Sequence, residues 1–215
     1  MRVNIIMPPG KPLSWILLTL ALNIAYADDA KPFPAQCQND CVTPYGEKLG
    51  DSPGGVEAYS NCQSDCVNPQ SNHWKGTYTG IKWQCVEYAR RWLLVKKGAV
   101  YGDVDVAADI WNKIDHLTQV ATNRTIPLES YLNGSEQAPQ VGDLLIYARA
   151  FHDTGHVAVV TDADYKQGVI EVGEQNYSNE PWPDDYTRKI ELIRKGDKYW
   201  LLDGYLIGWK HPGEL

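Results

Sequence analysis

The sequence lacks an apolar run long enough to cross a membrane. Its longest, Leu13 to Ala25, holds about a dozen residues, whereas a spanning helix needs about 20. Arg2 and Lys11 precede this run, and Ala25-Tyr26-Ala27 ends it in the small-x-small form of a cleavage site. These features predict a signal peptide over residues 1–27 and a secreted or periplasmic protein. An uncleaved membrane tether is the alternative.

The sequence also lacks clusters of Lys and Arg, internal repeats, low-complexity tracts and a glycine-rich phosphate loop. It carries 20 Lys and Arg against 27 Asp and Glu, a net charge of −7 that loss of the signal peptide would change to −9. Such a charge does not steer a protein toward nucleic acid, so a neutral or cationic partner is expected. The length of 215 residues leaves no room for two full-sized domains.

Cysteines are few, and four of the five form two Cys-x3-Cys pairs. The pairs are Cys37 with Cys41 and Cys62 with Cys66. Residues four apart lie on one face of a helical turn, and the intervening prolines and glycines break any longer helix. We therefore expect residues 28–72 to form a small cysteine-rich hairpin of two short helices.

Two disulfides are expected in this hairpin if the protein is exported. Antiparallel packing would join Cys37 to Cys66 and Cys41 to Cys62, although the sequence does not exclude the other two connectivities. A four-cysteine zinc site is the alternative, but these spacings are longer than the usual two-residue knuckle, and we expect no metal. Either arrangement leaves Cys85 without a partner.

Cys85 stands where a helix is predicted to begin. Apolar side chains recur at the spacing of one buried stripe: Val86, Ala89, Trp92 and Leu93. Three charged residues fall off that stripe: Glu87, Arg90 and Arg91. Lys96, Lys97 and Gly98 are typical of a helix end. A cysteine in the first turn is favoured as a thiolate by free amides and the helix dipole, although a purely packing role is the simpler alternative.

The remainder, residues 73–215, is predicted to be one α+β domain. Residues 68–80 are polar and expected to be a linker, residues 104–114 have a helical pattern, and residues 118–139 are expected to be irregular apart from one short strand near Thr125. Strands are predicted at 143–148, 156–161, 168–172, 189–193, 199–202 and 205–209. Helices followed by short strands with tight turns favour an antiparallel sheet.

A nucleophilic cysteine needs a base and a group that orients the base. Among five histidines, His156 opens a predicted strand and is the preferred base, whereas His152 in the preceding loop is the rival. Glu174 and Asn176 end the next strand, where antiparallel pairing would bring one of them beside His156. The carboxylate of Glu174 or the amide of Asn176 would then hydrogen-bond to the imidazole and fix its orientation.

Four ordered motifs resemble those of CHAP-domain cysteine amidohydrolases, most of all the amidase domain of the bifunctional glutathionylspermidine synthetase/amidase family. They are Gln84-Cys85-Val86-Glu87-Tyr88-Ala89-Arg90-Arg91-Trp92, Val141-Gly142-Asp143-Leu144-Leu145-Ile146-Tyr147, Asp153-Thr154-Gly155-His156-Val157-Ala158-Val159-Val160 and Glu174-Gln175-Asn176. The resemblance implies a papain-like (CHAP/NlpC-P60-type) fold and no cofactor. It further implies Cys85 as nucleophile, His156 as general base and acid, Glu174 as orienting acid, Asn176 as a fourth site residue and Arg90 on the substrate side.

The expected reaction is attack of Cys85 on an amide, followed by hydrolysis of the thioester. The Cys85 amide, with Gln84 or a residue near Tyr78, is the expected oxyanion donor. Export favours amide bonds of peptidoglycan peptides as substrate. A glutathionylspermidine-like peptide–polyamine conjugate is the first alternative, and a non-catalytic secreted module whose hairpin docks a protein partner is the second.

Overall fold

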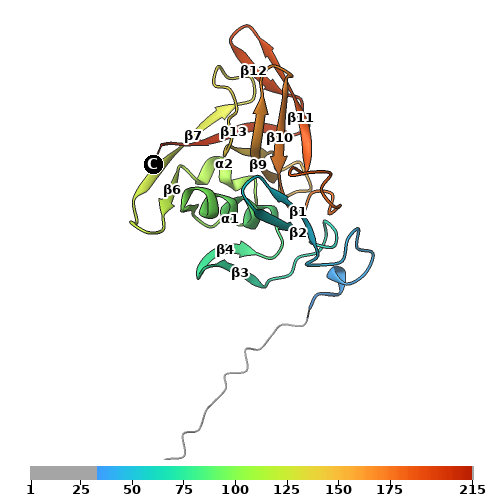
Figure 1. Ribbon diagram of the computed structural model, residues 1–215. Helices are drawn as coiled ribbons and strands as arrows, with labels where there is room; N and C mark the ends of the chain where they lie inside the picture. Colours follow the sequence, from blue (N-terminus) through green and yellow to red (C-terminus); the bar gives the residue numbers. More distant parts are fainter. Residues whose placement is uncertain (1–32, 215) are drawn as a thin grey trace, which may run out of the picture. The chain divides into compact units, whose positions relative to one another are not determined.

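Helix α1, Cys85–Lys97, lies at the centre of the computed structural model, which describes residues 33–214 (Figure 1). The predicted signal peptide, residues 1–27, lies outside the described residues. The helix begins at Cys85 and ends where Gly98 takes a left-handed conformation with φ 63° and donates its N–H to the Leu94 carbonyl at 3.0 Å. Glycine adopts that conformation without a Cβ penalty, so the predicted end of the helix is confirmed.

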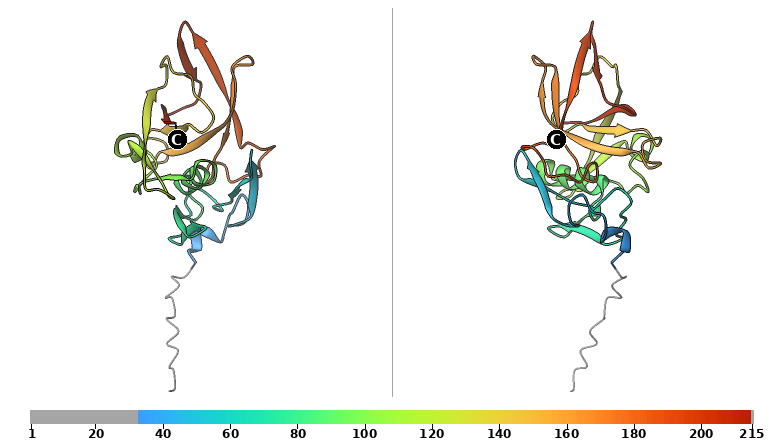
Figure 2. Two further views of the ribbon diagram at one scale, coloured as in Figure 1. Left: turned by 60° about the vertical axis from the view of Figure 1, so that its left-hand side comes forward. Right: turned by 90° about the vertical axis from the view of Figure 1, so that its right-hand side faces the viewer.

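The first two turns of α1 are buried on nearly all sides. The sheet lies on one side of the helix, and the hairpins β1–β2 (Lys48–Ser52 and Val56–Tyr59) and β3–β4 (Ser71–Trp74 and Thr77–Ile81) lie on the other (Figure 2). The prediction that Glu87, Arg90 and Arg91 fall off the buried stripe was therefore wrong. Their charges are compensated inside the protein, as in the 2.7 Å contact between Arg91 Nε and Glu87 Oε1.

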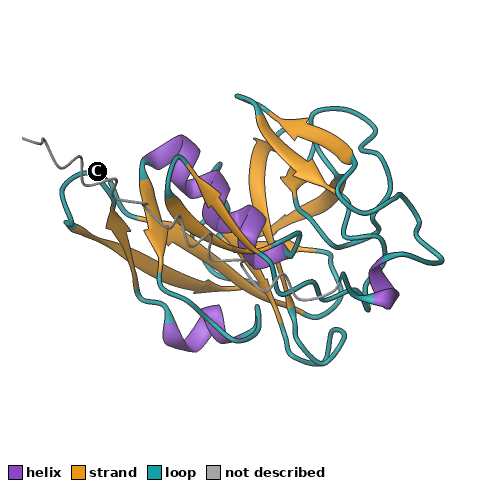
Figure 3. Cartoon of the chain, turned by 90° about the horizontal axis from the view of Figure 1, so that it is seen from below, coloured by secondary structure: helices purple, strands orange, loops and turns teal. Residues whose placement is uncertain are grey.

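The main sheet has nine strands in the order β12-β11-β10-β9-β8-β13-β7-β6-β5, and every neighbouring pair is antiparallel. Figure 3 shows α1 lying across this sheet. The predicted α+β class with an antiparallel sheet is confirmed. The strands are β5 Ala99–Tyr101, β6 His116–Gln119, β7 Thr125–Leu132, β8 Leu144–Tyr147, β9 His156–Asp164, β10 Val169–Gly173, β11 Arg188–Lys195, β12 Lys198–Leu201 and β13 Leu206–Pro212.

The sheet separates two hydrophobic cores because successive side chains of a strand point to opposite faces. The helix-side core combines α1 with one set of strand residues, including Tyr88, Ala89, Leu93, Leu144, Ile146, Val157 and Val159. The far-side core holds the alternate set, including Leu145, Tyr147, Ala158, Val160, Ile170, Val172, Ile190 and Trp209. The central strands are thus buried on both faces, which accounts for their continuous apolar sequences.

Two predictions for the middle of the chain need correction. The helix expected over residues 104–114 is limited to α2, Asp109–Lys113, and the expected irregular region contains both β6 and the eight-residue strand β7. Ile126 and Leu128 alternate inward along β7, so burial decides its conformation. Pro127 offers no N–H to the sheet, but its carbonyl accepts a hydrogen bond from Gly213 N at 2.9 Å.

The predicted helical hairpin at residues 28–72 was wrong in its secondary structure. The first cysteine pair follows a single 3-10 turn, η1 (Ala35–Cys37), and the second lies in a turn. Cys62 has φ 69°, a left-handed conformation that a helix interior excludes. Strands β1 and β2 occupy the region between the pairs, and β3–β4 replaces the expected linker. The disulfides join Cys37 to Cys66 and Cys41 to Cys62, as antiparallel packing suggested.

The cystine segment, residues 37–66, is hydrogen-bonded to the loop that follows β10. Tyr59 N donates to Gln175 Oε1, and Asn61 N donates to Asn179 Oδ1, both at 2.8 Å. Trp182 N likewise donates to the carbonyl of Leu49 at 2.8 Å. These contacts place the cystine segment and the loop after β10 in one packed assembly. Within residues 33–214, no helix has the length and apolarity needed to span a bilayer.

Removal of either disulfide is expected to lower the free energy of unfolding. The bridges close loops with sequence separations of 29 and 21 residues, for which loop-closure entropy gives about 3–4 kcal/mol each. Urea denaturation of Cys37→Ser/Cys66→Ser and Cys41→Ser/Cys62→Ser variants would measure the loss. A matched reduced wild-type sample should show both losses combined, and an unchanged denaturation midpoint would contradict this expectation.

Candidate active site

Cys85 is the first residue of α1, and its side chain is held at the sheet end where β9 begins. The residue is 9% exposed, and it is the only cysteine outside the disulfides. The sulfur accepts hydrogen bonds from the backbone amides of Val86 and Val157, and it interacts with the ring of His156. These donors all favour the thiolate over the thiol. The surroundings of Cys85 therefore favour ionisation of the thiol more than a purely packing role would require.

His156 opens β9 and is 2% exposed. Its Nε2 lies 2.8 Å from Glu174 Oε2, which leaves Nδ1 for the interaction with Cys85. Glu174 directly follows β10 and is 1% exposed. The structure therefore brings Cys85, His156 and Glu174 into one continuous chain of contacts. It is His156, and not the exposed His152, that interacts with the thiol.

Sheet register explains why His156 and Glu174 meet. Gly173 pairs with Val159 across β9 and β10, so Glu174 follows on toward the start of β9. Tyr147 of β8 is the direct partner of His156. Alternation along each strand places these side chains on the far-side face, and diagonal neighbours there are within reach of long side chains. Cys85 approaches the same end of the sheet from the helix side.

Ionisation of the site is strongly coupled. Burial alone opposes the thiolate, but the charge and hydrogen bond of His156 offset it and lower the pKa of Cys85. Burial likewise opposes the imidazolium, but the Cys85 thiolate and then the Glu174 carboxylate raise the pKa of His156 to about 9. Burial would raise the pKa of Glu174, yet Arg188 and His156 lower it. The coupling therefore favours the thiolate–imidazolium pair over the neutral pair.

Arg188 was missed from the sequence, although it contacts the site directly. It is the first residue of β11, and its Nε donates to Glu174 Oε1 at 2.7 Å. The strand was predicted to start at Lys189. Arg188 lies on the same face of the strand as the buried residues Ile190 and Leu192, which follow it by two and four positions. That even spacing was the signal available in the sequence.

Aromatic side chains surround His156 on the far-side face. The rings of Tyr147 and Tyr177 lie 5.6 and 5.4 Å from the imidazole, and Phe151 lies at 5.9 Å. Phe151 also stacks on Tyr177 with ring centroids 6.1 Å apart. These rings exclude water from the imidazole on that side, which strengthens its electrostatic contacts. Phe151 and Tyr177 were not singled out by the sequence.

Gln84 and Asn176 are adjacent to the site but bind each other. Asn176 Nδ2 donates to Gln84 Oε1 at 3.0 Å, and Gln84 Nε2 donates to the Cys66 carbonyl at 3.1 Å and to Asn61 Oδ1 at 3.3 Å. Both amide hydrogens of Gln84 are thus directed at the cystine segment. This geometry does not support Gln84 as an oxyanion donor, and it assigns Asn176 to holding Gln84 rather than His156.

Arg90 is placed in the interior of the protein, away from the predicted substrate side. Its guanidinium donates to the carbonyls of Thr79, Tyr101 and Gly102 at 2.8–3.1 Å, and it contacts Asp103 at 3.0 Å. These bonds fix the turn after β5 against α1. The side chain is only 2% exposed, so its position does not support direct substrate contact.

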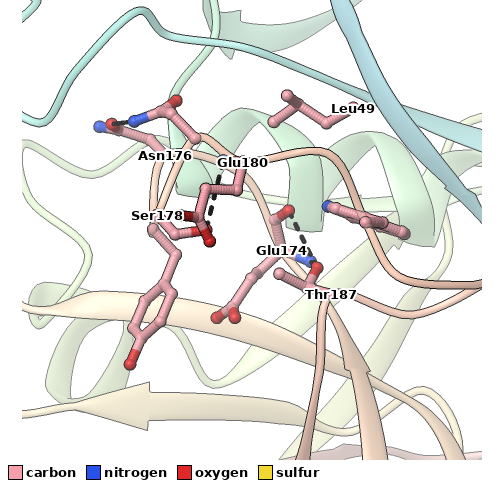
Figure 4. Close-up of a pocket in the computed structure, with 9 residues that line it drawn as sticks. Leu49, Glu174, Asn176, Ser178, Glu180 and Thr187 are labelled. Carbon is pink, nitrogen blue, oxygen red and sulfur yellow. Dashed lines mark hydrogen bonds between the residues drawn. The ribbon is translucent and has the colours of Figure 1, made fainter. Parts of the chain in front are cut away.

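A small pocket lies beside Glu174 rather than over the thiol. It is lined by Leu49, Glu174, Asn176, Tyr177, Ser178, Asn179, Glu180, Trp182 and Thr187, most of them from the loop after β10 (Figure 4). Cys85 and His156 are not among its lining residues, so the pocket lies against the Glu174 side of the contact chain. In the described part of the chain, no group of three or more His, Cys, Asp or Glu side chains is arranged to hold a metal ion.

Hydrolysis and thiol alkylation are expected to differ in pH dependence. As pH falls, the thiolate is lost through the lowered pKa of Cys85, so both rates should fall on the acid side. As pH rises through about 9, His156 loses the proton needed by a leaving amine, so only hydrolysis should fall. Parallel measurements of kcat/KM and of iodoacetamide alkylation, from acid pH to above pH 9, would test the assignment of the two limbs to Cys85 and His156. Loss of alkylation on the alkaline side would contradict it.

Comparison with known proteins finds a domain match over the residues that form this site. Residues 76–176 match the CHAP domain family. The chain is 36% identical over 181 residues to the bifunctional glutathionylspermidine synthetase/amidase of Escherichia coli (strain K12), covering 77% of this chain and 29% of that protein. It is 34% identical over 177 residues to the trypanothione synthetase of Crithidia fasciculata, covering 81% of this chain and 26% of that protein.

The chain thus spans less than a third of the length of these curated relatives. The CHAP match contains Cys85, His156, Glu174 and Asn176, and so includes both the helix start and the sheet end that form the site. Its papain-like fold agrees with a helix that presents a cysteine to an antiparallel sheet. Residues 76–176 therefore carry a CHAP domain, and this is the part of the chain that holds the candidate site.

Proposed function

We propose that the protein is an exported cysteine amidase that hydrolyses amide bonds through Cys85, His156 and Glu174. One observation carries the proposal: a buried imidazole contacts the thiol and is held by a carboxylate 2.8 Å from Nε2. This is the arrangement that a thiolate nucleophile, its base and the orienting acid require. The alternative of a non-catalytic module leaves three coupled buried ionisable groups without a role.

In the proposed reaction the Cys85 thiolate attacks the amide carbonyl carbon. The His156 imidazolium then gives its proton to the leaving amine as the C–N bond breaks and a thioester remains on Cys85. Neutral His156 next takes a proton from water, whose oxygen attacks the thioester, and the thiolate leaves as the carboxylic acid product forms. Glu174 keeps the ring in place and stabilises its positive charge in both steps.

The backbone N–H of Cys85 is the proposed oxyanion donor. The first N–H groups of a helix have no intrahelical acceptor and point out of its N-terminus. That amide belongs to the nucleophile itself, so an oxygen on the attacked carbon lies beside it in the tetrahedral intermediate. Gln84, whose amide hydrogens bind Cys66 and Asn61, is not assigned this role.

Amide bonds of peptidoglycan peptides are the first proposed substrate class. The support is compartmental: the two disulfides fit an oxidising environment, and residues 1–27 have the pattern of an export signal. An exported amidase would encounter cell-wall peptides there.

A peptide–polyamine conjugate is the second proposed substrate class. The observation that favours it is the likeness to proteins named for glutathionylspermidine and trypanothione, which extends over 77% and 81% of this chain. The net charge of −7 is also compatible with a cationic amine product.

A substrate panel combined with thiol mapping tests both classes. The purified protein is treated with limited iodoacetamide without reductant, mapped by mass spectrometry, and assayed on peptidoglycan fragments and on glutathionylspermidine. We expect alkylation at Cys85 alone and loss of fragment release in the alkylated protein. Cleavage of glutathionylspermidine alone would select the second class. An unreactive Cys85, or activity that survives its alkylation, would refute the proposed mechanism.

A further inference from the structure

Arg188 binds the carboxylate that the proposed mechanism uses, on the oxygen that His156 leaves free. Its Nε donates to Glu174 Oε1 at 2.7 Å, while His156 Nε2 lies 2.8 Å from Oε2. Glu174 is 1% exposed, so water does not replace either partner. The carboxylate is thus held between two cationic donors in a fixed orientation.

The guanidinium is itself fixed by the far-side face of the sheet. Its Nη1 donates to Asp203 Oδ2 at 2.6 Å and its Nη2 to the Tyr147 hydroxyl oxygen at 2.9 Å. The Tyr147 hydroxyl donates in turn to Asp203 at 2.6 Å, and the ring of Tyr177 lies 4.3 Å from the guanidinium carbon. A side chain with these contacts has little freedom to turn away from Glu174.

Charges alternate along the buried row that these residues form. In the reactive state Cys85 is negative, His156 positive, Glu174 negative and Arg188 positive, so the four groups sum to zero. Without Arg188 the row would carry one uncompensated negative charge and would bind a further proton, on the sulfur or on the carboxylate. A proton on either the Cys85 sulfur or the Glu174 carboxylate lowers the population of the reactive state, in which both groups are ionised.

We propose that Arg188 is a positioning residue for the hydrolysis, holding Glu174 ionised and oriented against His156 so that Cys85 remains a thiolate. This inference rests on the proposed function because it assumes the roles of those three residues. The hydrogen bonds of Arg188 go to Glu174, Asp203 and Tyr147 and not to the sulfur, and so it acts through Glu174.

The electrostatic surroundings support this role. After the opposing effect of burial, Arg188 is the largest influence that lowers the pKa of Glu174. Asp203 is the other carboxylate bonded to the guanidinium. The remaining titratable side chains that face Glu174 or Cys85 are tyrosines whose pKa burial raises: Tyr88, Tyr101, Tyr147 and Tyr177. None of these phenols supplies a charge at neutral pH that could replace the guanidinium.

The pH dependence of Cys85 alkylation by iodoacetamide tests the proposal without any substrate. In Arg188→Met the acid limb of the profile should move upward by about one pH unit or more, which makes alkylation at pH 6 about tenfold slower than in the wild type. Arg188→Lys should restore part of the shift because it retains the charge. Arg194→Met is the matched control. Arg194 lies on the same face of β11 and donates a hydrogen bond to the Gly196 carbonyl in the adjoining turn, so its replacement should leave the alkylation profile unchanged.

A second comparison avoids leaving a buried charge unpaired. If Arg188 acts through Glu174, then Glu174→Gln and the double variant Glu174→Gln/Arg188→Met should have the same alkylation profile. This comparison remains decisive if Arg188→Met alone does not fold, as judged by circular dichroism and Tm. A further shift in the double variant, or an unchanged profile in folded Arg188→Met, would overturn the proposal.

Failure of the proposed function has a different signature. If the alkylation profile shifts with the Arg188 substitutions but the wild-type protein cleaves nothing in the substrate panel, the amidase assignment is refuted. The positioning role of Arg188 is then left intact. If alkylation of the wild-type protein instead follows the ordinary cysteine pKa of about 8.5, Cys85 is not a thiolate at neutral pH. Both the proposed function and the positioning role would then fail.

Discussion

Replacement of Cys85 by alanine is expected to lower kcat for amide hydrolysis by about 10⁵-fold or more. The variant keeps His156 and Glu174, but the covalent route has no nucleophile and no thioester can form. The side chain is small and lies at a helix start, so its loss should leave the fold intact. The measurement is kcat on whichever substrate of the panel the wild type cleaves, with Tm recorded for each variant.

Two further variants separate chemistry from stability. Cys85→Ser should be nearly as inactive as the alanine variant, because His156 does not ionise a hydroxyl as it does a thiol. Val95→Ala on the same helix removes partly buried carbon and should lower Tm while retaining hydrolysis. Residual activity above about 1% of wild type in Cys85→Ala would identify another nucleophile and refute the thioester route.

Replacement of Glu174 by glutamine is expected to lower kcat by about 10³–10⁴-fold. Arg188 Nε donates to Oε1 in the native protein and would retain the amide oxygen of the new side chain. The amide N–H₂ would then face His156 Nε2 and force that nitrogen to accept. The ring proton would move to Nδ1, toward Cys85, where it prevents the neutral ring from acting as base. Steady-state kinetics across pH 6–9 provide the measurement.

Glu171→Gln is the matched control for this substitution. Glu171 lies on β10, three residues before Glu174, and pairs with the exposed Lys189 at 2.9 Å, away from the imidazole. Its loss should change kcat by less than about twofold, because exposed ion pairs contribute little. A Glu174→Gln variant with near-native kcat would show that the orientation of His156 does not depend on the carboxylate.

Local patterns were enough to predict the helix that begins at Cys85 and the strand ends near His156 and Glu174. The start at Cys85 and the stop at Gly98 depend on residues within one helix, so short-range periodicity captures them. His156 and Glu174 are likewise marked by neighbouring turns and by the ends of strands. Their meeting depends on a single pairing of adjacent antiparallel strands, which sequence order already suggests.

Residues whose role depends on distant partners were not predictable in the same way. Arg188 is a site residue because β11 pairs with β10 in one register, with Val172 opposite Arg188. Gln84 and Arg90 have suitable chemistry for substrate contact, but carbonyls from the cystine segment and from the turn after β5 occupy their donors. Side-chain type and spacing do not reveal that a donor is already bonded.

The cystine segment shows the limit of spacing rules. Cysteines four apart fit a helical face, but they fit a turn equally well when two disulfides supply the constraint. Asp40 and Cys62 take left-handed conformations, with φ 56° and 69°, that only the completed structure reveals. The connectivity was nevertheless suggested correctly, because it depends on the antiparallel course of the two pairs and not on their secondary structure.

The division of the interior into two cores has a consequence for how the candidate site responds to substitutions. Cys85 is packed in the helix-side core, whereas His156, Glu174 and Arg188 stand on the face of the sheet that covers the far-side core. Local opening of either core would therefore separate Cys85 from His156 before the whole protein unfolds. The contact between Cys85 and His156 thus depends on both cores, so a substitution remote from the thiol, in either core, is expected to weaken it while most of the structure persists.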